Sequence, residues 1–156
     1  MSMRKKNVIV SGGGRDIGRA CALELAKRGA NLVLTYHTSK ASVLSVVKDI
    51  EALGTKVIAV KADLTKQEDV DLVISATLSE FNQINSLVHV SGGLIRREKI
   101  AEMSDLYWDQ VMDVNLKSLF MMRSFIKFAD RLSISMGKAF SWCIVILMGG
   151  TCYEVF

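Results

Sequence analysis

A glycine-rich string, Ser11-Gly12-Gly13-Gly14-Arg15-Asp16-Ile17-Gly18, is the part of the sequence best suited to bind a ligand. It follows a short apolar run and precedes a segment with helical spacing. Glycines let the backbone turn tightly and carry no Cβ that would hold a phosphate away. The helix that follows points free N–H groups and a positive dipole end at the same place. The string therefore predicts a pyrophosphate-binding loop, whose cofactor-binding residues are Gly12, Gly14, Arg15, Asp16, Ile17 and Gly18.

Short apolar runs alternate along the chain with longer segments of helical period, and these must position the loop. We predict strands at residues 7–11, 31–36, 56–60, 86–91 and 143–148. Because the strands are continuously apolar, both of their faces are expected to be buried. The fold class is therefore α/β, a doubly wound parallel sheet (Rossmann fold), forming a single domain over residues 1–156.

Helices are predicted between these strands. The first spans 16–28, the second ends at Gly54, and a capping box over residues 65–68 opens the third. Ser104 is expected to cap a long fourth helix. Periodicity predicts a buried face in the first helix (Ile17, Cys21 and Leu25) and in the fourth (Trp108, Val111, Met112, Leu116 and Leu119).

The spacing of Ser11, Gly12 and Gly18 resembles the Thr-Gly-x-x-x-Gly-x-Gly loop of the short-chain dehydrogenase/reductase family. Asp16 replaces the middle glycine of that motif. An inward carboxylate would repel a pyrophosphate, so we expect Asp16 to face solvent or to help cap the helix.

Three later segments extend the resemblance. Ala62-Asp63-Leu64 follows the third strand, where the family's aspartate contacts adenine. His89-Val90-Ser91-Gly92 stands where the family has Asn-Asn-Ala-Gly beside the cofactor. Asn115 matches the asparagine of the family's catalytic tetrad. The resemblance therefore implies a catalytic residue, Asn115, and further cofactor-binding residues: Asp63, Leu64, Ser91 and Gly92.

The resemblance is dense from about residue 7 to residue 122 and fades after Arg123. Between Glu98 and Leu119 the chain is most similar to 3-oxoacyl-carrier-protein reductases and sugar dehydrogenases. This implies an oxidoreductase acting on a small carbonyl or alcohol substrate. The later part of the family's chain is missing from the sequence, so we expect the sheet to end after about the fifth strand.

The end of the second strand indicates which coenzyme is bound. NAD enzymes usually place a carboxylate there, bonded to the ribose 2′-hydroxyl. This chain has Tyr36, Thr38 and Lys40 in that segment and no carboxylate. Arg15 occupies a position that is basic in NADP-preferring family members. We therefore predict NADP rather than NAD, with Tyr36 and Thr38 among the contacts.

Asn115 falls on the apolar stripe of its helix, where a buried amide must be hydrogen-bonded. A bond to neighbouring backbone would explain it. The resemblance instead implies that it orders a water for a proton relay. His89 could act as a base, although a histidine ending a buried strand is more often structural.

The relay also needs a serine and a tyrosine followed four residues later by a lysine, and the sequence does not supply them where they are wanted. Tyr36 and Lys40 have the spacing but lie at the adenosine end. Tyr107 has no such lysine, and Thr151 is a weak substitute for the serine. Three interpretations stay open: an oxidoreductase represented by its cofactor-binding part, a non-catalytic NADP(H)-binding module, or an inactive truncated product.

The net charge of +4 comes from scattered residues, which argues against a nucleic-acid surface. No apolar stretch approaches the ~20 residues of a membrane span. The three cysteines are too widely spaced for a disulfide framework or a metal site, so we expect a cytoplasmic protein. An unpaired, apolar fifth strand would favour self-association or aggregation, with Trp108, Phe120, Phe125 and Phe128 as candidate contacts.

Overall fold

The computed structural model describes residues 2–124, 142–147 and 151–155, with backbone alone in the last two segments. Its elements are β1 (Asn7–Ser11), α1 (Asp16–Lys27), β2 (Asn31–Tyr36), α2 (Lys40–Ala52), β3 (Val57–Lys61), α3 (Gln67–Phe81), β4 (Ser86–His89), η1 (Ile100–Glu102), α4 (Asp105–Met112), η2 (Asp113–Lys117), β5 (Trp142–Leu147) and β6 (Thr151–Val155).

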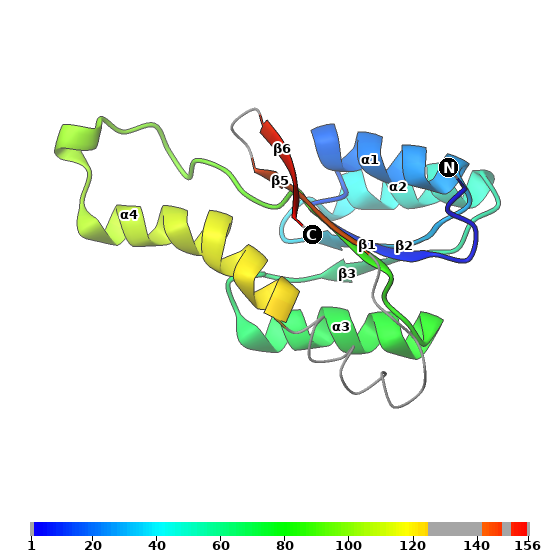
Figure 1. Cartoon of the computed structure of the whole chain (residues 1–156). Helices are drawn as coiled ribbons and strands as arrows, with labels where there is room; N and C mark the ends of the chain where they lie inside the picture. The colour runs from blue at the N-terminus through cyan, green and yellow to red at the C-terminus, as the bar shows by residue number, and fades with distance from the viewer. Residues whose placement is uncertain (1, 125–141, 148–150, 156) are drawn as a thin grey trace.

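The strands form one sheet in the order β3-β2-β1-β4-β5-β6, parallel throughout except for the last pair. Helices α1 and α2 cover one face, and α3 lies on the other (Figure 1). Alternate residues of β1 pack against the helices on opposite faces of the sheet. Val8 and Val10 pack with α1 and α2, whereas Ile9 packs with α3. The predicted doubly wound α/β fold is confirmed.

The outer edge of β5 is paired, so the prediction of an unpaired fifth strand is wrong. Strand β6 runs antiparallel to β5, with Cys143 opposite Val155 and Leu147 opposite Thr151. Residues 148–150 alone separate the two strands in sequence, whereas a parallel return needs a crossover of a dozen or more residues. The short spacing therefore dictates antiparallel pairing. The family resemblance predicted that β5 would be an unpaired edge strand, and it did not predict the pairing of β5 with β6.

The predicted face of α1 is also wrong in detail. Its buried residues are Gly18, Ala22 and Ala26, while Ile17 is 42% exposed. Small side chains let α1 lie close to the sheet. A hydrophobic pattern that counts large apolar residues therefore predicts burial of the neighbouring face of α1.

The capping box at the start of α3 does not form. The helix begins at Gln67, and its N-cap residue, Lys66, makes no capping hydrogen bond with its side chain. The Thr65 hydroxyl donates to the Asp63 carboxylate, at 2.7 Å, and makes no described hydrogen bond to an amide of α3.

Helix α4 begins as predicted, because the Ser104 hydroxyl accepts a hydrogen bond from the Tyr107 amide. Its buried face differs from the predicted stripe. Tyr107, Ser118, Met121 and Met122 are buried, whereas Trp108 is 55% exposed. A π-helical turn, η2, follows α4, and helical backbone continues to residue 124. The extra residue of a π turn shifts the later side chains around the helix, which a regular period does not capture.

Among the described residues, no helix has both the length and the apolar character needed to cross a bilayer.

Candidate coenzyme-binding site

A cleft opens at the carboxyl ends of β1, β2, β3 and β4. The chain runs outward from β1 to β2 and β3, then returns to place β4 on the other side of β1. Such a reversal point is where doubly wound sheets bind ligands. The lining residues are Gly12, Gly14, Arg15, Thr35, Tyr36, His37, Thr38, Ser39, Ala62, Asp63, Leu64, Thr65, Ser91, Gly92, Val114 and Ser118.

The loop after β1 leaves room for a phosphate and supplies donors to bind it. Gly12 has φ +70°, a conformation that glycine adopts without strain. A Cβ at Gly18 would lie 2.1 Å from the Gly12 carbonyl oxygen, so only glycine lets α1 start this close to the loop. No side chain caps the α1 N-terminus at Arg15, so the first-turn amides can serve a ligand. These features fit a dinucleotide pyrophosphate.

Asp16 opens α1 with φ +46° and lies exposed, without capping the helix. The solvent-facing alternative is therefore the one that the structure supports. The capping alternative is wrong.

Two buried hydroxyls fix the loop to the neighbouring strands. Ser11 Oγ accepts hydrogen bonds from the amides of Val90 and Ser91, at 3.0 and 3.2 Å. Thr35 Oγ1, at the end of β2, accepts one from the Gly12 amide at 3.2 Å. The end of β4 and the end of β2 are thereby held against the same loop, which fixes the width of the cleft.

Asp63 is the carboxylate that lines the cleft in the described part of the chain. Burial tends to raise the pKa of its carboxyl. Hydrogen bonds from the Thr65 hydroxyl and amide, with the positive charges of His37 and Lys66, lower that pKa below the ordinary value. A stably ionised acceptor at this position suits an amino group such as that of adenine.

Asn115 is held entirely by backbone. Its Nδ2 donates to the carbonyls of Gly93, at 2.9 Å, and Val111, at 2.8 Å, while its Oδ1 accepts from the Gly93 amide at 3.0 Å. A Cβ at Gly92 would lie 2.6 Å from Asn115 Oδ1. The glycine at 92 is therefore required for Asn115 to tie the segment after β4 to the π-helical turn.

His89 lies fully buried at the end of β4. Its Nε2 is 3.2 Å from Ser118 Oγ, and that hydroxyl donates its own proton to the Val114 carbonyl. The other ring nitrogen, Nδ1, has no hydrogen-bond partner among the described residues. Burial lowers the pKa of His89 to about 4, opposed only in part by the Ser91 backbone. This neutral, enclosed ring links β4 to the helix after η2, as its structural interpretation predicts.

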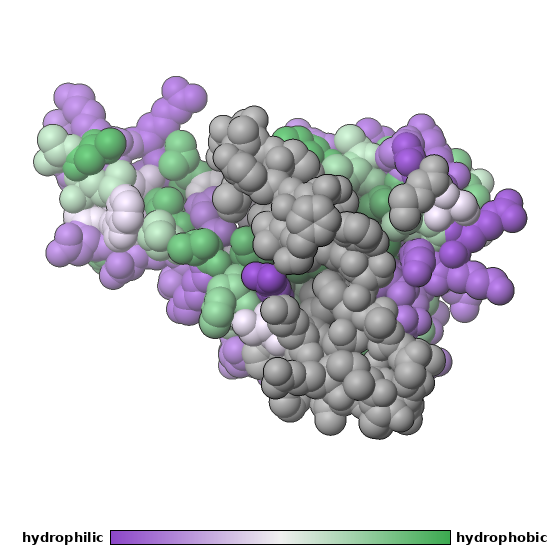
Figure 2. Space-filling view, in the orientation of Figure 1, coloured by the Kyte–Doolittle hydropathy of each residue, from purple (hydrophilic) through white to green (hydrophobic). Residues whose placement is uncertain are grey.

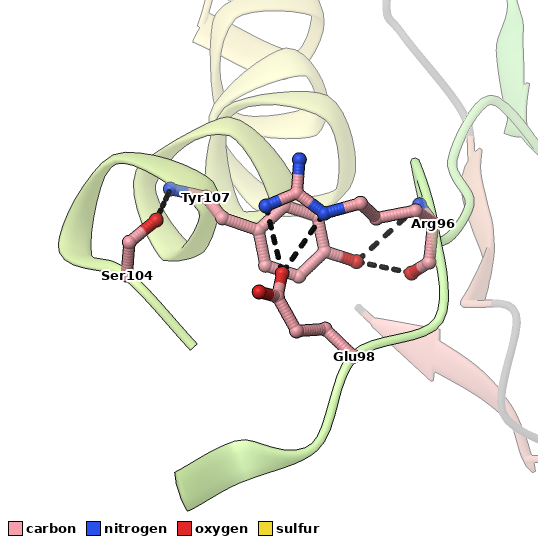
Figure 3. Close-up of polar contacts among 4 residues, drawn as sticks. All are labelled: Arg96, Glu98, Ser104 and Tyr107. Atoms are coloured by element: carbon pink, nitrogen blue, oxygen red, sulfur yellow. Dashed lines mark hydrogen bonds and ion pairs between the residues drawn. The ribbon is translucent and has the colours of Figure 1, made fainter. Parts of the chain in front are cut away.

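Tyr107 anchors the loop that leaves the cleft (Figure 3). Its ring is buried, and its hydroxyl donates to the Arg96 carbonyl and accepts from the Arg96 amide. The Arg96 guanidinium stacks 4.3 Å from the ring centroid and pairs with Glu98 at 2.8 Å. Since its hydroxyl is committed to backbone, Tyr107 does not supply an available proton donor.

Most of the predicted cofactor-binding residues lie together. Gly12, Gly14, Arg15, Tyr36, Thr38, Asp63, Leu64, Ser91 and Gly92 line the cleft. Asp16, Ile17 and Gly18 shape the loop without lining it, and Asn115 lies behind Gly92. Their contacts with a coenzyme stay a prediction.

Several residues that line the cleft were not predicted from the sequence as cofactor-binding: Thr35, His37, Ser39, Ala62, Thr65, Val114 and Ser118. The three around the end of β2 were open to prediction, since they belong to the same segment as Tyr36 and Thr38. Ala62 and Thr65 flank Asp63 and Leu64 after β3 and were open to prediction in the same way, whereas Val114 and Ser118 come from η2 and the helix that follows it. Thr151 lies in β6, whose backbone alone is described, and Phe125 and Phe128 lie outside the described residues.

Fold and cleft together define a dinucleotide-binding sheet of the Rossmann class. Residues 6–131 match the family model described as short chain dehydrogenase, and the chain belongs to the short-chain dehydrogenase/reductase family.

Relatives of known name support this assignment. The chain is 35% identical over 116 residues to the short-chain dehydrogenase/reductase FrzI of Cladobotryum sp, covering 74% of this chain and 45% of the relative. It is equally identical over 115 residues to the 3-oxoacyl-[acyl-carrier-protein] reductase FabG of Staphylococcus epidermidis, covering 74% and 47%. The chain thus spans about half the length of these relatives.

Solved structures show the same fold. The NADH-dependent reductase A1-R′, responsible for alginate metabolism, superposes with a TM-score of 0.82 and 29% identity, covering 92% of this chain and 58% of that one. A short chain dehydrogenase from Burkholderia cenocepacia J2315, in complex with NADP, gives a TM-score of 0.77 and 28% identity, covering 82% and 52%.

Proposed function

We propose that this chain is the coenzyme-binding part of an NADP(H)-dependent oxidoreductase acting on a small carbonyl or alcohol substrate. The observation that carries the preference for NADP(H) is the composition of the cleft at the end of β2. Arg15, Tyr36 and Thr38 line it there, and Asp63 follows β3 and is engaged by Thr65. The structural neighbours include an NADH-dependent and an NADP-bound protein, so the preference rests on this chain's own residues.

Arg15 is the principal candidate to recognise a 2′-phosphate. It lines the cleft and forms no ion pair with any described residue. A charge-assisted contact contributes about 1.5–3 kcal/mol, less where solvent screens it. Titration calorimetry should show NADPH binding roughly tenfold tighter than NADH, with Arg15→Ala removing the difference. Arg19→Ala, at an exposed arginine one turn along α1, is the matched control. Equal affinities in the wild type would refute the proposed preference.

A nicotinamide bound in the cleft would supply a hydride to the carbonyl carbon of the substrate, and the carbonyl oxygen would then need a proton. We assign to Asn115 the ordering of a water on the proton path. Its Oδ1 accepts one described hydrogen bond and has a second lone pair. This role is compatible with the backbone bonds of Asn115, because those bonds fix the side chain in position.

A non-catalytic NADP(H)-binding module is the second candidate, and one observation favours it. The two tyrosines whose side chains the structure describes, Tyr36 and Tyr107, do not supply the proton donor. Tyr107 is buried and bonded to the Arg96 backbone, and Tyr36 lies at the end of β2. NADPH absorbance followed with ketones and 3-oxoacyl thioesters separates the candidates. Turnover that Asn115→Ala abolishes supports the enzyme, whereas binding without turnover supports the module.

Self-association and a cytoplasmic location complete the proposal. Leu116, Trp108 and Phe120 are exposed on α4 and the helix that continues it. Figure 2 shows hydrophobic residues at the surface of this region among hydrophilic ones. Apolar surface of this kind favours contact with another protein surface. The widely spaced cysteines are consistent with a reducing compartment.

A further inference from the structure

A second cleft opens at the opposite edge of the sheet, at the amino ends of β1, β2 and β3. Its volume is about 620 Å³, within the range of about 300–1,000 Å³ that is usual for small-molecule sites. This edge lies next to the N-terminus, away from the coenzyme-binding cleft (Figure 1). No residue lines both clefts. The proposed function therefore does not account for the second cleft.

Positive side chains line this cleft from three parts of the chain, and we call it the basic cleft. They come from the turn before β1, from the end of α1 and from the residue before β3: Arg4, Lys27, Arg28 and Lys56. Glu80, near the end of α3, is the only carboxylate among the residues that line it. All five side chains belong to exposed residues, so they are accessible to a ligand from solvent. Figure 2 shows hydrophilic residues projecting at this end of the molecule, on the right of the view.

Two of these cations have no partner on the described part of the chain. Arg4 and Lys27 form no ion pair with any residue whose side chain the structure describes. Arg28 pairs with Glu24 at 2.8 Å, and Lys56 lies 3.8 Å from the Glu80 carboxylate. The guanidinium of Arg4 and the ammonium of Lys27 are therefore available to an anionic ligand.

The floor of the basic cleft is held by hydrogen bonds between side-chain amides and backbone. Asn7 is buried, and its Nδ2 donates to the Gln83 carbonyl at 3.0 Å, while its Oδ1 accepts from Asn31 Nδ2 at 3.0 Å. The stem of Arg4 lies against Gly29, where a Cβ would come within 2.9 Å of Arg4 Cγ. The site is thus formed before a ligand arrives, which lowers the entropic cost of binding.

The ends of α1, α2 and α3 give a structural reason for basic residues here, because the carboxyl end of a helix favours cations. Each helix end is equivalent to about half a negative charge. The lining side chains carry four positive charges and one negative charge. Glu24 offsets Arg28, whereas Lys5 and Lys6 adjoin Arg4 in the sequence and add positive charge. The balance stays positive, so this edge of the sheet attracts anions.

We propose that the basic cleft binds a small molecule that carries two or more linked phosphoryl groups. Arg4, Lys27 and Lys56 reach the cleft from different elements, and a chain of phosphoryl groups presents several negative charges along its length. Guanidinium and ammonium groups form charge-assisted hydrogen bonds with phosphate oxygens. Because the cations line a cleft rather than an extended surface, a small polyanion fits the site better than a nucleic acid does.

The test is isothermal titration of the 156-residue chain with inorganic tripolyphosphate. Arg4→Gln with Lys27→Gln should weaken binding about three- to tenfold, as expected for two charge-assisted contacts at an exposed site. Lys48→Gln with Arg97→Gln removes the same charges from exposed positions outside both clefts, and should change the affinity by less than about twofold. Glu80→Gln should tighten binding about twofold, because it removes the carboxylate that repels the ligand.

Absence of tripolyphosphate binding, or equal losses in the two double variants, would overturn the inference. Binding that Arg4→Gln with Lys27→Gln leaves unchanged would place the anion elsewhere, such as at the loop after β1, and would overturn it as well. Weaker binding by Glu80→Gln would do the same. The affinity of this double variant for NADP⁺ should equal that of the wild type, so the result is independent of the proposed function. Because the substituted residues are exposed, circular dichroism should show that every variant folds as the wild type does.

Discussion

The loop after β1 and the segment after β4 meet at the same cleft but are held in place by different kinds of interaction. The loop depends on glycines and close backbone approach, with 2.1 Å from a Gly18 Cβ to the Gly12 carbonyl as its tightest constraint. The segment after β4 depends on polar side chains, since His89, Asn115 and Tyr107 each bond a residue remote in sequence.

This difference predicts two kinds of sensitivity. Where backbone atoms are in close contact, an added side chain cannot be accommodated without moving the backbone. A single added methyl group therefore displaces the whole loop. Hydrogen-bonded side chains can be replaced with graded loss, and a histidine among them adds a dependence on pH. Substitutions in the first region should therefore act through the size of the new side chain, and substitutions in the second through its charge and hydrogen bonding.

Gly18→Val should have the largest effect. The added side chain would clash with the Gly12 carbonyl, and overpacking of this kind costs about 3 kcal/mol at the upper end of its usual range. We expect the affinity for both coenzymes to fall roughly a hundredfold, measured by calorimetry on folded protein. Ala20→Val, which puts the same side chain at an exposed position of α1, should bind as the wild type does. Unchanged binding by Gly18→Val would show that the loop adapts, and the comparison would fail.

Acidification should destabilise the second region through His89. Its pKa is about 4 in the folded chain against 6.5 ordinarily, so its contribution to stability is complete above pH 6.5 and is lost as the pH falls toward 4. The free energy of unfolding should drop by about 2 kcal/mol between about pH 7.5 and pH 5 from this group. Urea unfolding at both pH values measures it.

His89→Asn should remove that part of the pH dependence. The chain has two histidines, and His37→Asn is the matched control because His37 is exposed. A wild-type stability that is equal at both pH values, or a drop that His89→Asn leaves intact, would contradict the assignment.

Self-association is expected from the apolar surface of the second region. The double variant Trp108→Glu with Phe120→Glu should weaken association roughly tenfold, because large aromatic residues dominate protein contacts. Sedimentation over a range of micromolar concentrations measures it, with Leu53→Glu on the opposite face of the sheet as the control. A wild-type chain that sediments as a monomer throughout would remove this expectation.

Tyr107→Phe should have the smallest effect. It removes one hydroxyl and leaves the Arg96 carbonyl without that donor, at a cost of about 1 kcal/mol in the free energy of unfolding. The buried ring and its stacking with Arg96 are kept. The Tyr36 hydroxyl has no hydrogen bond among the described residues, so Tyr36→Phe should change the free energy of unfolding much less. Equal losses in the two variants would show that the hydroxyl of Tyr107 does not anchor the loop.

Much of the fold could be predicted because local patterns suffice for it. Continuous apolar runs such as 7–11 and 31–36 predicted buried parallel strands, and these strands form. The spacing of the glycines predicted a tight turn between the first strand and the first helix. The face of α1 was mispredicted because small residues, which pack closest, contribute little to a hydrophobic pattern.

The candidate site could be predicted in part. Tyr36 ends β2, and Thr38 and Asp63 follow the ends of β2 and β3. The carboxyl ends of parallel strands meet at one edge of the sheet, so the gathering of these residues in the cleft follows from topology. Ser118 and Val114 join the cleft from a helix that could not be oriented by periodicity, because the π turn shifts its side chains.

By itself, the sequence determined where the backbone must turn and which strands are buried, since glycine conformation and apolar runs act over a few residues. Only the tertiary structure decided which polar groups are engaged. It committed Asn115 to the Gly93 backbone, Tyr107 to Arg96 and Ser11 to Val90 and Ser91, and it left Arg15 and His37 facing the cleft. Hydrogen bonds select partners by position in space, and residues far apart in sequence acquire such positions only when the helices pack on the sheet.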